Sequence, residues 1–270
     1  MSSHYESREE RLAVMRSMNL FSNDFMNVAL EDKAACEYVL RILTKIPDLC
    51  VQTVTVQWRV AHSADRDVVI DVLAEDSRGR LYNVEVQRGD GPDHFKRIRL
   101  YRAEIDSKMM EKGSGYDALP ELYIIYLSET DILHSGLAWD EVESTFRRSR
   151  EGYSDGSHII FVNGAVDEKD EISRLMKYFK TADPEDRTHG ALSDYVYMLK
   201  RTEKGADIMC DKAKLIFDGG AFVARADAVI TLMKNTGWSM ETTMDQLGID
   251  AADRPEMEAL IRERMDGRTA

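Results

Sequence analysis

Three polar side chains interrupt two otherwise apolar segments of the sequence. Asp71 lies in the middle of VVIDVL (68–73), and Glu85 and Gln87 lie two residues apart in YNVEVQ (82–87). An ionised carboxylate in such a run is costly to bury without a partner. Two neighbouring carboxylates also repel each other unless a proton or a metal ion lies between them. These residues therefore indicate either a divalent-metal centre or a pair of acids that bind Arg or Lys.

A hard divalent cation such as Mg²⁺ binds oxygen ligands, often one or two carboxylates together with water and substrate phosphate. An ion held by Asp71 and Glu85 would polarise a phosphoryl oxygen and supply a hydroxide as the attacking group. The amide of Gln87 would orient that water or the phosphate. For two strand carboxylates alone, ion pairing with Arg or Lys is the commoner arrangement, so the wider pattern has to decide.

The elements around these residues are strands. Alternating β-branched and aromatic residues predict three of them, over 51–60, 67–75 and 81–88. The turn DSRGR, which contains Gly79, joins the second and third strands into a hairpin. Successive side chains of a strand point to opposite faces, so Glu85 and Gln87 project together. The hairpin can bring Asp71 next to Glu85.

Other segments complete an α/β pattern followed by a helical one. Helical spacing of apolar residues predicts helices over 32–44 and 95–112, and apolar runs predict strands over 121–128 and 158–164. Beyond these, the sequence predicts only helices, over 168–180, 190–203, 206–218 and 220–235. We therefore expect an α/β core in residues 1–165 and a helical region in residues 166–270.

Arg97 and Tyr101 lie four residues apart on the second of these helices and so share a face. That face is expected to differ from the apolar stripe of Phe95, Ile98 and Ile105. Arg97 offers a forked guanidinium to phosphate, and Tyr101 can bind a phosphate or orient Glu85. The alternative is a solvated helix face on which Arg97 pairs with Glu104 or another acid.

The net charge of −13 argues against a protein that binds nucleic acid over its whole surface, because phosphate contacts dominate such affinity. A local basic patch remains compatible with DNA binding. Its candidate residues are Arg78, Arg80, Arg88, Lys96, Arg97, Arg99 and Arg102. The C-terminal stretch 237–265 predicts two short helices around LGID, which resemble a helix-turn-helix; the alternative is that they pack on their neighbours.

Other classes of protein are disfavoured by the sequence. No run of about 18 apolar residues predicts a membrane span, and the charged N-terminus does not resemble a signal peptide. Three widely separated cysteines indicate reduced thiols in the cytoplasm. The six histidines lack the spacing of zinc ligands, and no phosphate-binding glycine loop is present.

The runs IDVLAEDSRGRLYNVEVQ and FKRIRLYRAEIDSKMMEKGSGYDALPELYIIYLS resemble the PD-(D/E)XK nuclease family transposases, an Rpn-like recombination-promoting nuclease group. The resemblance covers roughly residues 24–135. It implies a restriction-endonuclease-like fold, with a mixed central sheet flanked by helices and a helical C-terminal extension. It also implies DNA cleavage that depends on Mg²⁺, for which Mn²⁺ can substitute. Asp71 matches the motif aspartate and Glu85 the acidic residue of the E-x-K element.

Gln87 departs from the motif, since it stands where a lysine is usual, although E-x-Q is similar to the form common in this subgroup. Glutamine cannot serve as a cation, so a lysine at this position is expected to keep the fold and to raise cleavage if the missing charge limits the rate. Glu37, on the first predicted helix, is a further candidate to approach the metal. The resemblance also implies that Arg97 and Tyr101 contact the DNA backbone.

The leading hypothesis is a metal-dependent DNA endonuclease of mobile-element type. The alternative is a degenerate nuclease fold that binds DNA or protein, which the missing lysine and the charge of −13 favour. RNA is a further candidate substrate, because two carboxylates and a metal do not distinguish it from DNA. Whether the chain acts alone or as a homodimer is left open.

Overall fold

The computed structural model describes residues 7–60, 68–89, 93–110, 112–251 and 253–266. Contacts divide the chain into two compact units. Among the described residues, the larger unit contains those of 14–60 and 68–209, and the smaller one contains residues 7–13 and those from 210 onward. Among the described residues, no helix combines the length and the apolar character needed to span a membrane.

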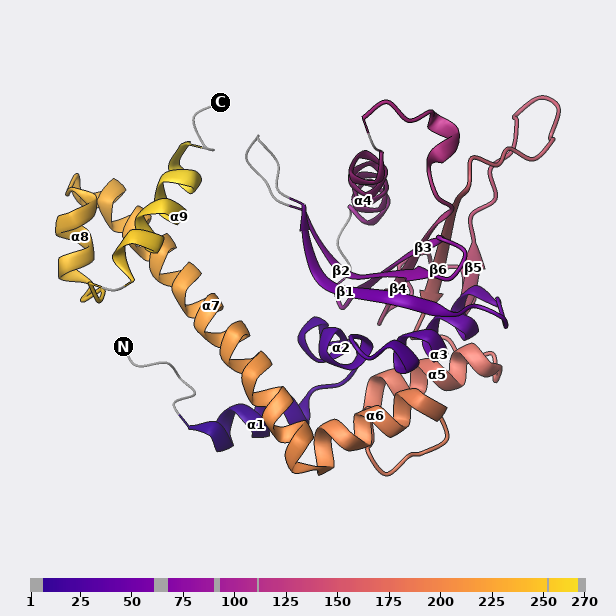
Figure 1. Cartoon of the computed structure of the whole chain (residues 1–270), viewed down its shortest axis with the longest axis horizontal. Helices are drawn as coiled ribbons and strands as arrows, with labels where there is room; N and C mark the ends of the chain where they lie inside the picture. Colours follow the sequence, from indigo (N-terminus) through magenta and orange to yellow (C-terminus); the bar gives the residue numbers. More distant parts are fainter. Residues whose placement is uncertain (1–6, 61–67, 90–92, 111, 252, 267–270) are drawn as a thin grey trace. The chain divides into compact units, whose positions relative to one another are not determined.

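The larger unit is built on a mixed six-stranded sheet with the order β1-β2-β3-β4-β6-β5 (Figure 1). Its strands are β1 (Val51–Val60), β2 (Val68–Asp76), β3 (Leu81–Gln87), β4 (Leu122–Ser128), β5 (Trp139–Glu141) and β6 (Ser157–Asn163). The first three strands are antiparallel neighbours, whereas β3, β4 and β6 run parallel, and β5 is antiparallel to β6. The five strands expected from the sequence are confirmed. The three-residue β5 is too short for alternation to predict it.

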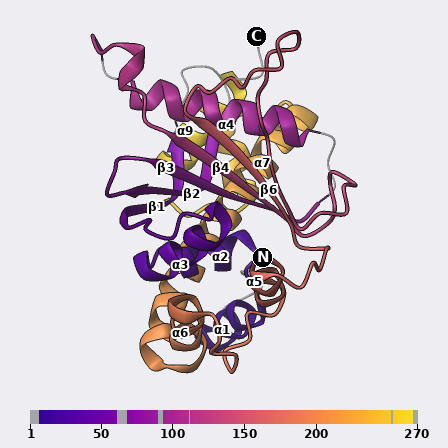
Figure 2. The same ribbon diagram turned by 90° about the vertical axis from the view of Figure 1, so that its right-hand side faces the viewer.

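Helices cover both faces of this sheet. One face carries α4 (His94–Met109), and the helices on the other face include α2 (Asn23–Leu30) and α3 (Lys33–Thr44) (Figures 1 and 2). Farther along the chain, α5 (Glu171–Thr181) and α6 (Gly190–Arg201) lie on this second side, where α6 packs against α3. The short helices α1 (Arg8–Ser17) and η1 (Tyr116–Ala118) complete the elements before α5. This arrangement confirms the expected restriction-endonuclease-like α/β fold.

The turn between β2 and β3 fixes the hairpin that carries the candidate site. Asp76, which is buried, accepts hydrogen bonds from Arg80 Nε (2.7 Å), from the Tyr82 hydroxyl (2.9 Å) and from the amides of Arg78 and Arg80. Burial acts to raise the pKa of Asp76, but these hydrogen bonds outweigh it and hold the pKa below its usual value. Gly79 adopts φ 75°, a conformation that other residues rarely take.

The described residues after position 165 contain helices and no strand, as the sequence predicts. The segments expected to form two helices over 206–218 and 220–235 form one, α7 (Glu203–Thr236), followed by α8 (Met240–Gln246) and α9 (Arg254–Asp266). Within the smaller unit, α8 and α9 pack against α7 through a buried apolar cluster: Ala226, Val229, Ile230, Met244, Ile249, Met257 and Ile261. By contacts, α5 and α6 group with the sheet. The division of the chain at residue 165 into a core and a helical region stays a prediction.

Candidate metal centre

Asp71 and Glu85 lie where the pairing of β2 with β3 ends. The pairing runs from Glu75 opposite Leu81 to Val72 opposite Val84, and the next residues are the two acids. The Asp71 amide donates to Glu85 Oε1 (3.2 Å), and the amide of Val86 donates to Asp71 Oδ2 (3.3 Å). Each carboxylate thus binds a backbone amide of the opposite strand. We call this arrangement the carboxylate fork; it lies between two inner strands of the sheet, at the end of their pairing.

A change of face in β2 places Asp71 in the fork. Ile70 and Leu73 both belong to the apolar cluster that packs against α4. Residues three apart in a regular strand point to opposite faces, so the strand switches face between them. The β1–β2 register places Gln57 opposite Asp71, and Gln57 has a left-handed backbone with φ 50°. This irregularity lets Asp71 Oδ1 accept a hydrogen bond from the Asn23 amide of α2 (3.3 Å).

Both acids of the carboxylate fork have a raised pKa, so they stay protonated to a higher pH than exposed acids do. The pKa of Asp71 is raised to about 6, mainly by burial and to a smaller extent by the charge of Asp24; hydrogen bonds with Val86 and Glu85 and the charge of Arg97 act in the opposite direction. Burial also raises the pKa of Glu85 well above its usual value, with the charge of Asp71 adding to the effect. Among the described residues, neither acid forms an ion pair with Lys or Arg. The simple ion-pair alternative therefore does not describe this site.

Gln87 follows the fork on β3, and its side-chain oxygen is occupied. Gln87 Oε1 accepts from Arg97 Nη1 (3.0 Å) and from the Tyr126 hydroxyl (3.4 Å). The Tyr126 hydroxyl also lies 2.9 Å from His94 Nδ1, and Arg97 pairs with Asp93 of its own helix (3.5 Å). Because two donors hold the oxygen, the amide nitrogen of Gln87 is the group left to donate to a bound phosphate or water.

The comparison with known families can now be added to this geometry. A family model for the PD-(D/E)XK nuclease family transposase matches residues 51–217, which include the whole sheet and the carboxylate fork. The chain belongs to this family. Neither the curated proteins nor the solved structures include one that matches the chain.

For this PD-(D/E)XK chain, the structure brings together the five residues singled out in the sequence. Arg97 reaches Gln87, as described above, and Tyr101 forms a hydrogen bond with Glu85 that counteracts the rise in its pKa. The expectation that Tyr101 lies off the apolar stripe of its helix is wrong. Tyr101 is buried in one cluster with Ile98 and Ile105. Phe95 is 65% exposed, and its ring meets that of Phe161, a member of the cluster, edge to face.

In this nuclease-family chain, the helix residues that act on the fork are Asn23 and Asp24, and not Glu37 as expected from the sequence. Glu37 accepts a hydrogen bond from the Val51 amide (3.0 Å) and pairs with Arg41 (2.6 Å), so it fixes the start of β1 and does not contact the fork. Asn23 and Asp24 of α2 act there instead, one by a hydrogen bond and the other by its charge. The polar pair directly before the apolar run FMNVAL was the available signal for them.

A divalent ion fits this donor set if water and substrate supply the ligands that the protein does not. The described residues contain no group of three or more His, Cys, Asp or Glu side chains that could hold a metal. Mg²⁺ is commonly held by one or two carboxylates, with water and phosphate completing its shell. Asp71 and Glu85 supply two such carboxylates, and both are buried without an ion pair to Lys or Arg among the described residues. The PD-(D/E)XK site thus fits an ion completed by substrate.

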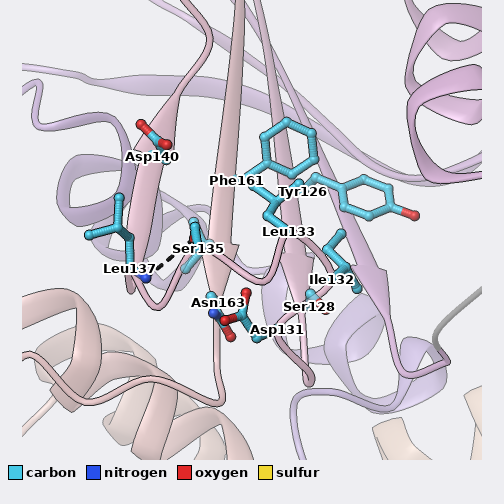
Figure 3. A pocket seen from close by; sticks show the side chains of 11 residues that line it. Tyr126, Ser128, Asp131, Ile132, Leu133, Ser135, Leu137, Asp140, Phe161 and Asn163 are labelled. Carbon is cyan, nitrogen blue, oxygen red and sulfur yellow. Dashed lines mark hydrogen bonds between the residues drawn. The ribbon is translucent and has the colours of Figure 1, made fainter.

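A small cavity of about 10 Å³, partly open to solvent, borders the site through Tyr126 (Figure 3). It lies at the carboxyl ends of β4 and β6, and the loop 131–137 closes its other side. Two buried atoms in its lining, Asp131 Oδ1 and Asn163 Nδ2, have no hydrogen-bond partner among the described residues. The pocket thus offers one acceptor and one donor beside the Gln87 network, a suitable place for an ordered water.

Proposed function

We propose that this protein is a Mg²⁺-dependent DNA endonuclease of mobile-element type, which hydrolyses phosphodiester bonds at the carboxylate fork. The observation that carries the proposal is the pair of buried acids, Asp71 and Glu85, whose pKa values are both raised and which form no ion pair with Lys or Arg in the described chain. Such a pair destabilises the protein when ionised, unless a cation is bound between the two acids. Perturbed carboxylates of this kind are typical of functional sites.

Each residue of the site has a role in this proposal. Asp71 and Glu85 would hold the ion, and Mn²⁺ can replace Mg²⁺ because both take oxygen ligands. When bound, the ion supplies Lewis-acid activation of the phosphoryl oxygen and of water. The Gln87 amide nitrogen donates to the scissile phosphate or to the attacking water. Tyr101 fixes the Glu85 carboxylate. Arg97 holds Gln87 through Nη1 and pairs with Asp93 through Nη2, so a neighbouring phosphate would bind this guanidinium in place of Asp93.

The test is nicking of supercoiled plasmid by the full chain with Mg²⁺, with Mn²⁺ and with EDTA. We expect relaxed and linear products with either metal and none with EDTA. An RNA of similar length, digested side by side, establishes which nucleic acid is cleaved. Absence of metal-dependent cleavage, with DNA binding retained, would instead favour the degenerate binding module, which the absence of a lysine at position 87 supports.

The Gln87 oxygen accepts hydrogen bonds from Arg97 and Tyr126. A lysine at position 87 would lose both, so its expected effect on stability and cleavage differs from the one that the sequence alone predicts. In Gln87→Lys, an ammonium group would replace an acceptor that lies 3.0 Å from the Arg97 guanidinium. Repulsion between the two cations, together with the lost acceptor, should cost about 1–3 kcal/mol of stability. We therefore expect Gln87→Lys to lower the melting temperature and to leave cleavage no faster than in the wild type.

A second variant separates repulsion from a general packing defect. Gln87→Lys combined with Arg97→Met removes one of the two cations, and its melting temperature should recover toward that of Arg97→Met alone. If Gln87→Lys by itself is as stable as the wild type and cleaves faster, then the missing cation limits the rate and Arg97 is not tied to Gln87 as described.

A further inference from the structure

We infer that the hairpin joining β5 to β6, residues 142–156, is an arm that binds the phosphate backbone of duplex DNA. Its tip, STFRRSR (144–150), carries three arginines, and one acid flanks it on each side, Glu143 and Glu151. Arg147, Arg148 and Arg150 are all exposed. In a protein whose net charge is −13, this is a local concentration of positive charge, and the screening length of about 8 Å at physiological salt keeps its field largely independent of distant acids.

The arginines project from a defined turn. Thr145 forms a bridge with Gly152, the Phe146 amide donates to the Glu151 carbonyl (2.9 Å), and the Arg150 amide donates to the Phe146 carbonyl (2.9 Å). The rings of Phe146 and Tyr153 meet edge to face, with centroids 5.7 Å apart. A hairpin held in this way presents its cations with less loss of entropy on binding than a flexible loop would.

Ion pairing distinguishes these arginines from five of the seven basic residues singled out in the sequence; Lys96 and Arg99 of α4 are the other two. Arg78 pairs with Asp48, Arg80 with Asp76, Arg88 with Glu129, Arg97 with Asp93, and Arg102 with Asp155. Within the described parts of the chain, Arg147, Arg148 and Arg150 form no ion pair. Their charge is therefore available to phosphates, which an arginine can bind through two parallel hydrogen bonds.

The base of the arm is tied to the helix that serves the carboxylate fork. Asp155 forms an ion pair with Arg102 of α4, the helix that also supplies Arg97 and Tyr101. The hairpin projects from the sheet on the side where α4 lies (Figures 1 and 2). A duplex held by the arm would therefore lie on the α4 side of the sheet. The choice of DNA as the partner rests on the proposed function; the arm itself would contribute affinity without sequence preference.

The test measures binding of the full chain to a fluorescent duplex of about 30 base pairs in EDTA, by anisotropy, over a range of salt concentrations. EDTA removes cleavage from the measurement, so a failure of the nuclease proposal does not affect the result. The arm variant is Arg147→Gln, Arg148→Gln and Arg150→Gln together. The control, Lys177→Gln, Arg187→Gln and Arg201→Gln, removes the same charge from cations that are paired with Asp167, Asp194 and Glu185.

We expect the arm variant to bind the duplex roughly tenfold or more weakly than the wild type. The slope of log K against log salt should fall by about 2 to 3, since each phosphate contact contributes about 0.9. The control should keep the wild-type slope, and both variants should keep the wild-type melting temperature. An unchanged slope in the arm variant, an equal loss in the control, or tighter binding to single-stranded RNA of equal length would each overturn the inference.

Discussion

Asp71→Asn and Glu85→Gln are each expected to reduce metal-dependent plasmid nicking by on the order of a thousandfold. Each substitution keeps the size of the side chain and removes one anionic ligand from the carboxylate fork. Metal activation of a phosphoryl oxygen supplies several kcal/mol to catalysis, and each 1.36 kcal/mol corresponds to a factor of ten in rate. Loss of either ligand should therefore remove most of the measurable activity. The measurement is the initial rate of plasmid relaxation at saturating Mg²⁺, for proteins of verified fold.

Glu75→Gln is the matched control, because Glu75 lies on the same strand as Asp71 and is exposed. It changes the net charge by the same amount and should nick DNA at the wild-type rate. Retention of activity by Glu85→Gln would place the catalytic centre away from the fork. Equal loss in all three variants would mean that nicking follows net charge or overall fold, and not the two buried acids.

The sequence predicted the elements that hold the carboxylate fork more fully than it predicted the fork itself. Alternation places Glu85 and Gln87 on one face of β3, and the short turn at Gly79 fixes the hairpin; both follow from local rules. The break of alternation at Asp71 does not, because apolar residues surround Asp71 on both sides and leave no alternation to read. The irregular backbone that accompanies it includes a left-handed Gln57 in the neighbouring strand, which the sequence of β2 cannot show.

Contacts between elements distant in sequence were likewise outside what local patterns can predict. Asn23 reaches Asp71 across 48 residues, and Tyr126 reaches Gln87 across 39. Glu37 was a candidate because it lies on a helix beside the sheet, but in the folded chain it binds the Val51 amide at the start of β1. Side-chain partners of this kind are set by how helices dock on the sheet, which single-sequence periodicity does not specify.

Without metal, Asp71→Asn should stabilise the protein at alkaline pH. The folded state binds the Asp71 proton more tightly than the unfolded state, because the pKa rises from 3.8 to about 6 on folding. The stability from that proton is complete below about pH 4 and is lost as the pH rises toward 6. At pH 8 the ionised side chain then costs on the order of 3 kcal/mol, which asparagine removes. We expect Asp71→Asn to melt roughly 5 °C or more above the wild type at pH 8 in EDTA, and the difference to vanish near pH 4.

Millimolar Mg²⁺ or Mn²⁺ should reverse this order of stability. An ion that binds only the folded fork stabilises the wild type by mass action, by about 2.7 kcal/mol at one hundred times its Kd. Asp71→Asn lacks one ligand and should gain little, whereas Glu75→Gln should gain as much as the wild type. The gain should shrink below about pH 6, because protons compete for the same oxygens. Thermal melts of the three proteins at pH 5 and pH 8, with metal and with EDTA, measure both effects. An equal metal response in the wild type and Asp71→Asn would mean that the ion binds elsewhere.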